Sequence, residues 1–362
     1  MTVTPSVLAF TSRGHPVFSP WREALGARVP LQAVWGADGA DLRRHFLRLA
    51  PPDSDPPRLV PLATWGAPWR PWHQRWLRRQ WPELRTVVFT RPDQAALLPA
   101  FGDVRRIYYA IDDYATYRRD WNEAEVALLT SADRLICVSQ ALANTLARRG
   151  AGVAAKTTVL PNAIPASWLP PTPPARPSPL PENLALPRPL AGVLGRISSR
   201  LRLDWLLAAM DATPWLHWVF VGDIEWGEVV GSDRPHLAQL RRHPHSTWLG
   251  KRSFAALRDF AAALDVAVLP YSERSTNPHG SAVRLFAHLP FAAPLLATPG
   301  CTQVEEFSPL VTVCKSSAAL NDTLSAARAS NFDDGRRAER WRVAQDHTWE
   351  ARATAWLPLL DP

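Results

Sequence analysis

A proline-rich stretch in the middle of the chain constrains the fold more than any other feature of the sequence. Residues 161–189 carry eleven prolines, among them Pro170-Pro171 and Pro173-Pro174. Proline fixes φ and has no amide hydrogen to donate, so this stretch cannot form a helix or a central strand. We therefore expect a semi-rigid linker over 166–189, which divides the 362-residue chain into two domains of ordinary size.

Short apolar runs alternate with amphipathic segments on both sides of this linker. Strands are predicted at 7–10, 58–62, 86–90, 106–111, 134–139 and 157–160, and again at 190–195, 218–222, 247–249, 267–270, 295–298 and 310–313. Helices are predicted near 121–131, 140–149, 203–211, 253–263, 281–289, 317–329 and 335–356. Strands separated by helices of this length form parallel sheets. The sequence thus predicts an α/β protein with two Rossmann-like domains, at 1–165 and 190–345, and a C-terminal helix at 346–362 that packs back on the first domain.

Composition excludes several classes of protein. Hydrophobic residues make up 46% of the chain and charged residues 20%, which is typical of a folded soluble domain. No run approaches the roughly 20 apolar residues that a membrane-spanning helix needs. The first residues lack the basic and apolar regions of a secretory signal. The three cysteines (Cys137, Cys301 and Cys314) are an odd number without metal-ligand spacing, so we expect reduced thiols in a cytoplasmic protein.

The chain is basic, with 41 lysines and arginines against 33 acidic residues and a formal charge of +8. Nearly all of the positive charge is arginine, a bias that a genome rich in G and C would also produce. A positive charge favours anionic partners such as phosphates. Because no basic run lies in a recognisable nucleic-acid module, we do not expect a nucleic-acid partner.

Glycines and cations follow the predicted strands of the second half. Parallel α/β sheets bind ligands at the carboxyl ends of their strands, so these residues should face a ligand. Glycine permits close approach of backbone, and the Gly280 and Ser281 amides at the start of helix 281–289 should donate to an anion. Lys251-Arg252 has the alternative of a simple charged turn. Together the set suits a diphosphate; it comprises Gly195, Arg196, Arg200, Gly222, Gly250, Lys251, Arg252, Gly280, Ser281 and Arg284.

In their order and spacing these segments resemble the C-terminal domain of GT-B glycosyltransferases, of the large retaining group (family 4-like) that includes sucrose- and mannosyl-transferring enzymes. The similar pieces in the second half are Gly195-Arg196 with Arg200, 219–222, 247–250 with Phe254 and Leu257, 263–270, 281–298, and Trp349-Glu350 with Arg352. In the first half they are 108–113, 132–139 and 160–162.

The resemblance implies two Rossmann-like domains that face each other across a cleft, and a sugar transfer from a nucleotide-diphosphate sugar to a glycan or lipid-linked acceptor. It implies retention of configuration and no metal or other cofactor, because guanidinium groups stabilise the charge on the leaving oxygen. The donor would bind Gly195, Arg196, Arg200, Gly222, Lys251, Gly280, Ser281 and Arg284. His279, Asp112 and His15 are the candidate catalytic residues.

The sequence departs from the family at two donor-site positions. Many relatives carry two glutamates eight positions apart, one for the donor sugar and one for the ribose, where this chain has His279 and Ala287. An alanine side chain cannot bind a ribose hydroxyl. The alternative function is therefore a catalytically impaired protein of the same fold that binds sugar nucleotides. An epimerase of this fold would need an acid and a base, for which we find no convincing set.

Three features of the first half keep two or more interpretations. Asp112-Asp113 suits an acceptor-side role, a helix N-cap or a metal site. His15 lies where relatives approach the acceptor, or is an ordinary loop histidine. Trp69, Trp72 and Trp76, interleaved with arginines, suit a helix packed on the sheet or one that lies on an anionic membrane surface near a lipid-linked acceptor.

Overall fold

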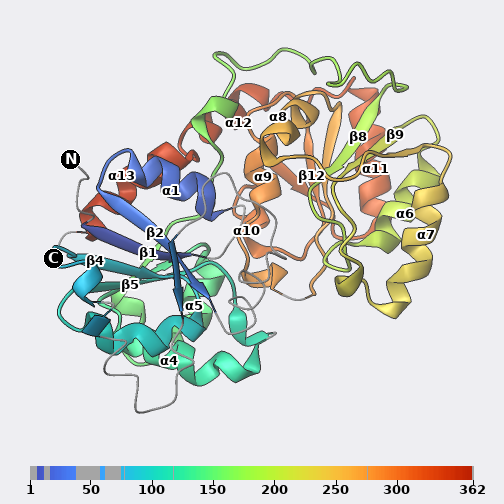
Figure 1. The fold of residues 1–362 in the computed structure, drawn as a ribbon. Helices are drawn as coiled ribbons and strands as arrows, with labels where there is room; N and C mark the ends of the chain where they lie inside the picture. Colours follow the sequence, from blue (N-terminus) through green and yellow to red (C-terminus); the bar gives the residue numbers. More distant parts are fainter. Residues whose placement is uncertain are drawn as a thin grey trace. The chain divides into compact units, whose positions relative to one another are not determined.

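The computed structural model describes residues 6–11, 17–37, 58–61, 75–76, 78–116, 118–274 and 276–360. The chain forms two compact units, one of residues 1–161 and 349–362 and one of residues 162–348 (Figure 1). The proline-rich stretch from 166 to 189 thus belongs to the second unit. His15, Trp69 and Trp72 lie outside the described residues, so the interpretations that rest on them stay predictions.

The first unit is built on a seven-stranded sheet in the order β3-β2-β1-β4-β5-β6-β7, with parallel pairing throughout. The chain moves outward in both directions from β1 and β4, which is the Rossmann pattern. Its strands are β1 (Val7–Thr11), β2 (Leu31–Ala37), β3 (Arg58–Pro61), β4 (Thr86–Phe89), β5 (Arg105–Ala110), β6 (Arg134–Cys137) and β7 (Thr157–Val159). Its helices are α1 (Phe18–Gly26), α4 (Asn122–Ser131), α5 (Gln140–Ala147) and α13 (Trp349–Leu360), with 3₁₀ turns at Pro92–Phe101, Tyr114–Thr116, Arg119–Trp121 and Ala154–Lys156.

Aromatic side chains fill both faces of this first sheet. On one face Phe10 and Phe89 stack with ring centroids 5.7 Å apart, and Phe101 packs edge-on against both. On the other face the Trp356 ring of α13 lies 5.0 Å from that of Trp21 on α1. The C-terminal helix is thereby part of the core of the first unit.

The second unit has a six-stranded parallel sheet in the order β10-β9-β8-β11-β12-β13. The strands are β8 (Leu190–Leu194), β9 (His217–Val221), β10 (Ser246–Trp248), β11 (Val266–Leu269), β12 (Leu295–Ala297) and β13 (Val311–Val313). The helices are α6 (Leu203–Ala212), α7 (Arg234–Arg242), α8 (Phe254–Ala262), α9 (Val283–His288), α10 (Thr302–Glu305), α11 (Ser317–Ala329) and α12 (Arg337–Gln345). Short 3₁₀ turns lie at Ala166–Trp168, Trp226–Glu228, Gly231–Asp233 and Asn277–His279.

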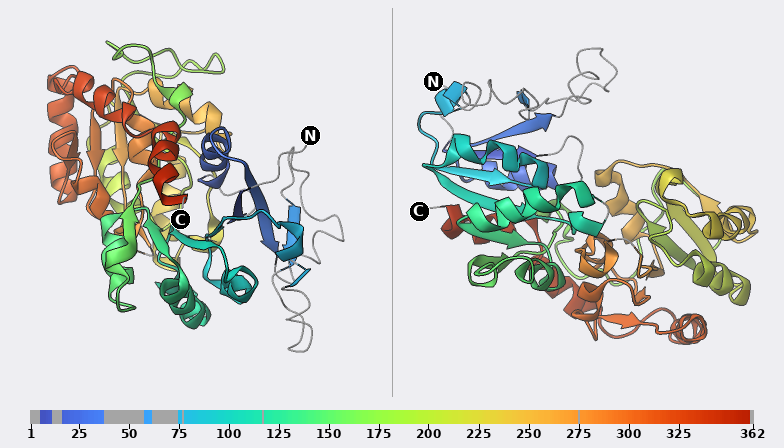
Figure 2. Two further views of the ribbon diagram at one scale, coloured as in Figure 1. Left: turned by 90° about the vertical axis from the view of Figure 1, so that its left-hand side faces the viewer. Right: turned by 90° about the horizontal axis from the view of Figure 1, so that it is seen from below.

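Alternate residues of these strands enter two separate apolar clusters, one on each face of the sheet. Leu190 and Val219 pack beneath α8 and α9, whereas Ala191 and Trp218 pack beneath α6, α7 and α11. This period of two follows from the pleat of a strand covered on both sides. Figure 2 shows the helices of each unit lying on both faces of its sheet.

Some elements differ from those that the sequence pattern predicts. Helix α1, strand β2 and helix α7 were not predicted; α7 is strongly polar and buries only Leu237 and Leu240. The single helix predicted over 335–356 is wrong, because the chain leaves the helix between α12 and α13. There the Ile164 amide donates to the His347 carbonyl at 3.1 Å, and Ile164 pairs with Thr348 as a parallel bridge. Among the described residues, no helix has the length and apolar character required to cross a bilayer.

Replacing Trp356 by alanine should lower the free energy of unfolding by about 3–5 kcal/mol, because the ring is 1% exposed and its removal leaves a cavity against Trp21. Urea unfolding followed by circular dichroism measures the change. Thr354→Ala, at an exposed position of the same helix, is the control and should stay within about 0.5 kcal/mol of the parent. Equal stability of the two variants would show that α13 contributes little to the core.

Candidate anion-binding site in the second unit

Three arginines gather where β8 and β11 end, and we call Arg196, Arg200 and Arg284 the arginine cluster. β8 and β11 are the neighbouring strands from which the chain moves outward in both directions, the position at which open α/β sheets bind ligands. Arg196 and Arg200 lie in the loop after β8, and Arg284 lies in α9. The three are close enough for their charges to repel one another, since both loop arginines lower the pKa of Arg284.

Arg284 fastens the loop that follows β8. Its Nε donates to the Leu194 carbonyl oxygen at 2.6 Å, and its Nη2 donates to the Arg196 carbonyl oxygen. Its guanidinium carbon lies 5.6 Å from the centroid of the buried Tyr271 ring. Burial lowers the pKa of Arg284 and Tyr271 opposes this shift, while the neighbouring guanidinium groups add to it. A guanidinium stays protonated in proteins, so Arg284 is a cation in a crowded positive environment.

Arg200 is held by the segment that follows β11. Its Nε donates to Asn277 Oδ1 at 2.9 Å and its Nη2 donates to Thr276 Oγ1 at 3.2 Å. The Asn277 amide returns a bond to the Arg200 carbonyl oxygen at 2.7 Å and another to the Ser272 carbonyl oxygen at 2.8 Å. Thr276 and Asn277 are almost fully buried, so they fix the direction of the Arg200 side chain.

Arg196 is the exposed member, with 57% of its side chain accessible. Its Nε lies 3.6 Å from Glu225 Oε2 and its Nη1 lies 3.7 Å from Glu228 Oε1. Exposed ion pairs at these distances stabilise weakly, because water screens both charges. An anion can therefore compete with them for Arg196.

The charge of the cluster is only partly balanced. In the part of the chain that the structure describes, no carboxylate lies within ion-pair distance of Arg200 or Arg284, whose hydrogen bonds go to neutral oxygens. Like charges held together cost free energy that a bound anion recovers. The cluster thus has the chemistry of a phosphate or diphosphate site.

The glycines at this edge of the sheet serve backbone packing. Gly195 has φ of +92°, a conformation that residues with a Cβ rarely adopt. At Gly222 a Cβ would lie 2.0 Å from the Gly195 carbonyl oxygen, so the ends of β8 and β9 approach each other this closely only because Gly222 lacks a side chain. We expected the Gly222 backbone to approach a ligand; the close neighbour that explains this glycine is Gly195.

The predicted helix-end amides are arranged differently from the expectation. Helix α9 begins at Val283, and the Gly280 amide already donates to the Asn277 carbonyl oxygen at 3.1 Å in a 3₁₀ turn. The amide of Ala282 donates to Gln303 Oε1 at 2.8 Å, and the Ser281 hydroxyl donates to the same oxygen at 2.9 Å. Gly280 is thus not an available donor in this structure, because the chain makes a turn before the helix.

The other predicted donor-site residues lie around the cluster without joining it. His279 is half-buried in the 3₁₀ turn that contains Asn277. Lys251 is exposed after the edge strand β10, two strands away from β8. Arg252 is used elsewhere, because its Nε donates to Glu182 Oε1 at 2.7 Å in the proline-rich stretch. Ala287 is buried in the apolar cluster beneath α9.

In the first unit, Asp112 and Asp113 have separate environments. Asp112 is half-buried after β5, and its Oδ1 accepts the Asp113 amide at 3.1 Å. Asp113 is 2% exposed and pairs with Arg149 Nη2 at 2.6 Å, while Arg149 Nη1 lies 2.5 Å from Glu125. Burial raises the pKa of Glu125, and Arg149 opposes that shift. Asp113 is therefore committed to an internal ion pair, whereas Asp112 is half-buried just after the end of β5.

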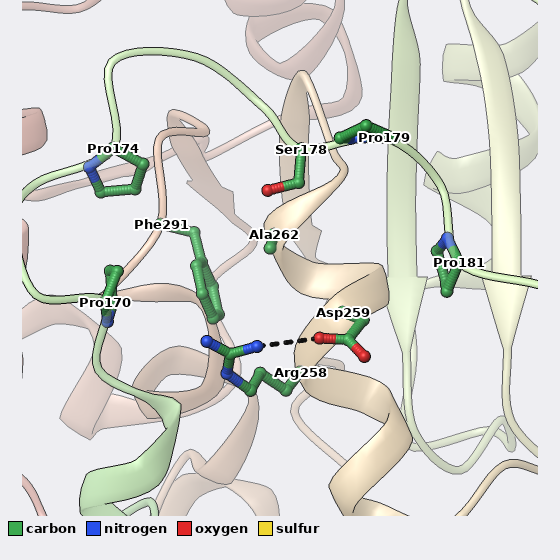
Figure 3. A pocket seen from close by; sticks show the side chains of 9 residues that line it. All are labelled: Pro170, Pro174, Ser178, Pro179, Pro181, Arg258, Asp259, Ala262 and Phe291. Carbon is green, nitrogen blue, oxygen red and sulfur yellow. Dashed lines mark hydrogen bonds and ion pairs between the residues drawn. The ribbon is translucent and has the colours of Figure 1, made fainter.

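No group of three or more histidine, cysteine or carboxylate side chains that could hold a metal occurs among the described residues. A cavity of about 250 Å³ lies between the proline-rich stretch and α8, lined by Pro170, Pro174, Ser178, Pro179, Pro181, Arg258, Asp259, Ala262 and Phe291 (Figure 3). Ala262 ends α8 just before β11 begins, so the cavity lies near the amino ends of the strands. It is therefore separate from the arginine cluster.

Several contributors to the site were not singled out from the sequence. They are Tyr271, Thr276 and Asn277, which hold the arginines, and Glu225 and Glu228, which face Arg196. One available signal was their position, because all five lie between a strand end and the next helix of the sheet. Polarity alone did not separate them from solvated loop residues.

No family model and no curated protein matches this sequence. Solved structures share its fold. HepE of Anabaena, in complex with UDP and glucose, aligns with a TM-score of 0.72 at 15% identity, covering 98% of this chain and 99% of that one. A glycosyltransferase from Rickettsia africae aligns with a TM-score of 0.67 at 10% identity, over 98% and 97% of the chains. The lipopolysaccharide outer core galactosyltransferase WaaB aligns with a TM-score of 0.56 at 13% identity, over 94% and 99%.

The fold class predicted from the sequence is confirmed. The two parallel sheets with the strand orders given above, and the similarity to these structures over nearly the whole chain, place the protein in the GT-B class. Its two units are both α/β and Rossmann-like.

Gly222→Ala should destabilise the second unit by about 2 kcal/mol or more, because the new methyl group meets the Gly195 carbonyl oxygen at a distance that the backbone cannot accept. Gly227→Ala is the matched control, since a Cβ there has no neighbour within 4 Å. Thermal and urea unfolding compare the two. If both variants unfold alike, the close approach of β8 and β9 does not exist in solution.

The buried His288 should make folding sensitive to acid. Burial lowers the pKa of His288 to about 3, and Arg284 adds to the shift; neither ring nitrogen has a hydrogen-bond partner in the structure. The unfolded chain therefore takes up this proton near pH 6.5 and the folded chain only near pH 3. Above pH 6.5 the neutral His288 does not reduce the free energy of unfolding. As the pH falls from 6.5 toward 3, that free energy decreases by at most about 1.4 kcal/mol per pH unit.

His288→Leu should flatten this part of the stability profile, measured by urea unfolding at intervals between pH 7 and pH 4. His245→Asn, which leaves His288 in place, is the control and should keep the steeper profile. An unchanged slope in the His288 variant would mean that the ring is solvated in the folded protein.

Proposed function

We propose that this protein is a glycosyltransferase that takes its sugar from a nucleotide-diphosphate sugar. The observation that supports it most directly is the arginine cluster at the ends of β8 and β11, where Arg200 and Arg284 carry charges that no described carboxylate balances. HepE, which shares the fold, was solved with UDP, with UDP and glucose, and with UDP-glucose. The nucleotide diphosphate would lie against the arginine cluster.

The cluster would serve the bond-breaking step electrostatically. As the bond between the anomeric carbon and the β-phosphate oxygen breaks, its electron pair moves to that oxygen. Arg196 and Arg200 would stabilise the developing negative charge, as preorganised cations do in water-poor sites. The acceptor hydroxyl oxygen then bonds to the anomeric carbon and gives its proton to the released phosphate oxygen, and the nucleoside diphosphate leaves. We propose that this reaction proceeds without a metal and with retention of configuration, as the resemblance to the retaining group implies.

The acceptor side belongs to the first unit. We propose that Asp112 contacts acceptor hydroxyl groups, because it lies just after the carboxyl end of β5, where parallel sheets bind ligands. His15 remains a candidate beside it, and His279 a candidate for the donor sugar. The acceptor would be a glycan or a lipid-linked sugar, used at the cytoplasmic side of a membrane. Lys251 is proposed only as a peripheral contact of the nucleotide.

A second candidate is a binding protein of the same fold with little or no turnover. Two observations favour it: His279 stands where many relatives have a glutamate, and Ala287 is buried in an apolar cluster. The methyl group of Ala287 cannot form a hydrogen bond with a ribose hydroxyl. Transfer and hydrolysis assays across a panel of nucleotide sugars separate the two functions, since a binding protein shows affinity without turnover.

Arg200→Ala should weaken binding of the nucleotide sugar by about 2 kcal/mol, or roughly thirtyfold, because one of the two loop cations is lost. Isothermal titration calorimetry with UDP-, GDP- and ADP-sugars measures it. Arg202→Ala is the matched control: Arg202 lies two residues away and pairs with Asp204 at 2.9 Å, so its loss should leave binding within about twofold.

Arg200→Lys keeps the charge but not both bonds to Thr276 and Asn277, and it should give an intermediate affinity. Thermal unfolding of each variant separates a binding defect from misfolding. A folded Arg200→Ala variant with the affinity of the parent would overturn the proposed site.

A further inference from the structure

The segment between β9 and α7, residues 222–233, exposes apolar side chains beside the arginine cluster. Among the described residues, three large hydrophobic side chains are strongly exposed, and two of them, Trp226 at 50% and Val230 at 44%, lie in this segment. A single exposed hydrophobic residue needs no explanation. Two such residues on one short segment, at the carboxyl edge of the sheet where the arginine cluster lies, do need an explanation.

This segment is fixed to the loop that carries Arg196. The Ile197 amide donates to the Asp223 carbonyl oxygen at 2.9 Å, and the Glu225 amide donates to the Ile197 carbonyl oxygen at the same distance, so Ile197 and Ile224 form a parallel bridge. Further along, the Val230 amide donates to Ser199 Oγ at 2.9 Å. The backbone on either side of the exposed Trp226 is therefore fixed, and a ligand would bind there without a cost for ordering the segment.

The segment is also bonded to the loop that follows β11. Asp233 Oδ2 lies 2.7 Å from Nη1 of Arg274, in the segment after β11. Glu225 and Glu228, which flank the ring of Trp226 in the sequence, both face Arg196. Trp226 thus lies in the sequence between two residues whose carboxylates are 3.6 and 3.7 Å from Arg196.

We propose that Trp226 is the surface on which the sugar ring of the donor stacks, and that it helps to select this sugar. The inference rests on the proposed function, because it places the sugar by the phosphate to which it is bonded. A diphosphate at Arg196 brings the group attached to it next to residues 225–228. The apolar face of a hexose packs on an indole ring, as flat ligands do on aromatic side chains.

The flanking carboxylates favour a sugar over a nucleobase as the occupant. When Arg196 turns to the diphosphate, Glu225 and Glu228 become free to accept hydrogen bonds from hydroxyl groups. A hexose ring presents several hydroxyl donors around its edge, whereas uracil presents only its N3–H. A segment that carries an exposed aromatic ring and two carboxylates therefore matches the sugar end of the donor.

Calorimetry on the full chain tests the proposal by comparing each nucleotide sugar with its own nucleoside diphosphate. The probes are UDP-glucose, UDP-galactose, GDP-mannose and ADP-glucose, and the tightest binder is then used with its matching diphosphate. Trp226→Ala should weaken the binding of the nucleotide sugar by about fivefold and the binding of the diphosphate by less than about twofold. Trp226→Phe should restore most of the loss, whereas Trp226→Leu, which is apolar but has no ring, should behave as the alanine variant does.

Four results would overturn the proposal. Equal losses for the sugar nucleotide and the diphosphate would assign the ring to the nucleoside. Unchanged affinity of Trp226→Ala for the nucleotide sugar, or full affinity of Trp226→Leu, would exclude stacking on the ring. If the parent protein bound none of the four nucleotide sugars, the proposed function would fail as well, which distinguishes that failure from one confined to Trp226.

Discussion

The bonds from Arg284 to the loop after β8 are the interaction on which the rest of the second unit's site depends. The guanidinium of Arg284 is stable in a crowded position near two other cations, because it donates to the carbonyl oxygens of Leu194 and Arg196. Those bonds close the end of β8 and determine where Arg196 leaves the sheet. Gly195 makes this possible by its positive φ. The same contacts therefore build the loop and concentrate positive charge on it.

The two units differ in how a central arginine is satisfied. In the first unit, Arg149 pairs with Asp113 and Glu125, both almost fully buried, and the phenol of Tyr108 donates to Glu125 at 3.0 Å. A buried network of this kind is stable because every member has a partner. In the second unit, Arg200 is oriented by neutral oxygens only. The contrast separates a structural ion network from a site that is completed by a ligand.

Local sequence patterns were informative about strands and less so about helices. Runs such as 86–90 and 134–139 predict β4 and β6 within one or two residues, because short apolar runs bounded by turn residues have few alternatives. α7 was missed because only two of its residues enter the core. The helix predicted over 335–356 divides at 346–348, because the Ile164 amide donates to the His347 carbonyl oxygen and Ile164 forms a bridge with Thr348. No pattern local to that helix encodes a partner so far away in the chain.

The sequence by itself determined the alternation of strands and helices, and with it the α/β class, since burial on both faces of a strand imposes a recognisable composition. It also placed arginines and glycines directly after the strands of the second sheet. Only the tertiary structure decided which of them act together. Arg196, Arg200 and Arg284 converge because β8 and β11 are adjacent, while Lys251 follows an edge strand and the Gly280 amide is taken by its own turn. Strand order and hydrogen-bond pairing are long-range properties, and no short segment of the sequence carries them.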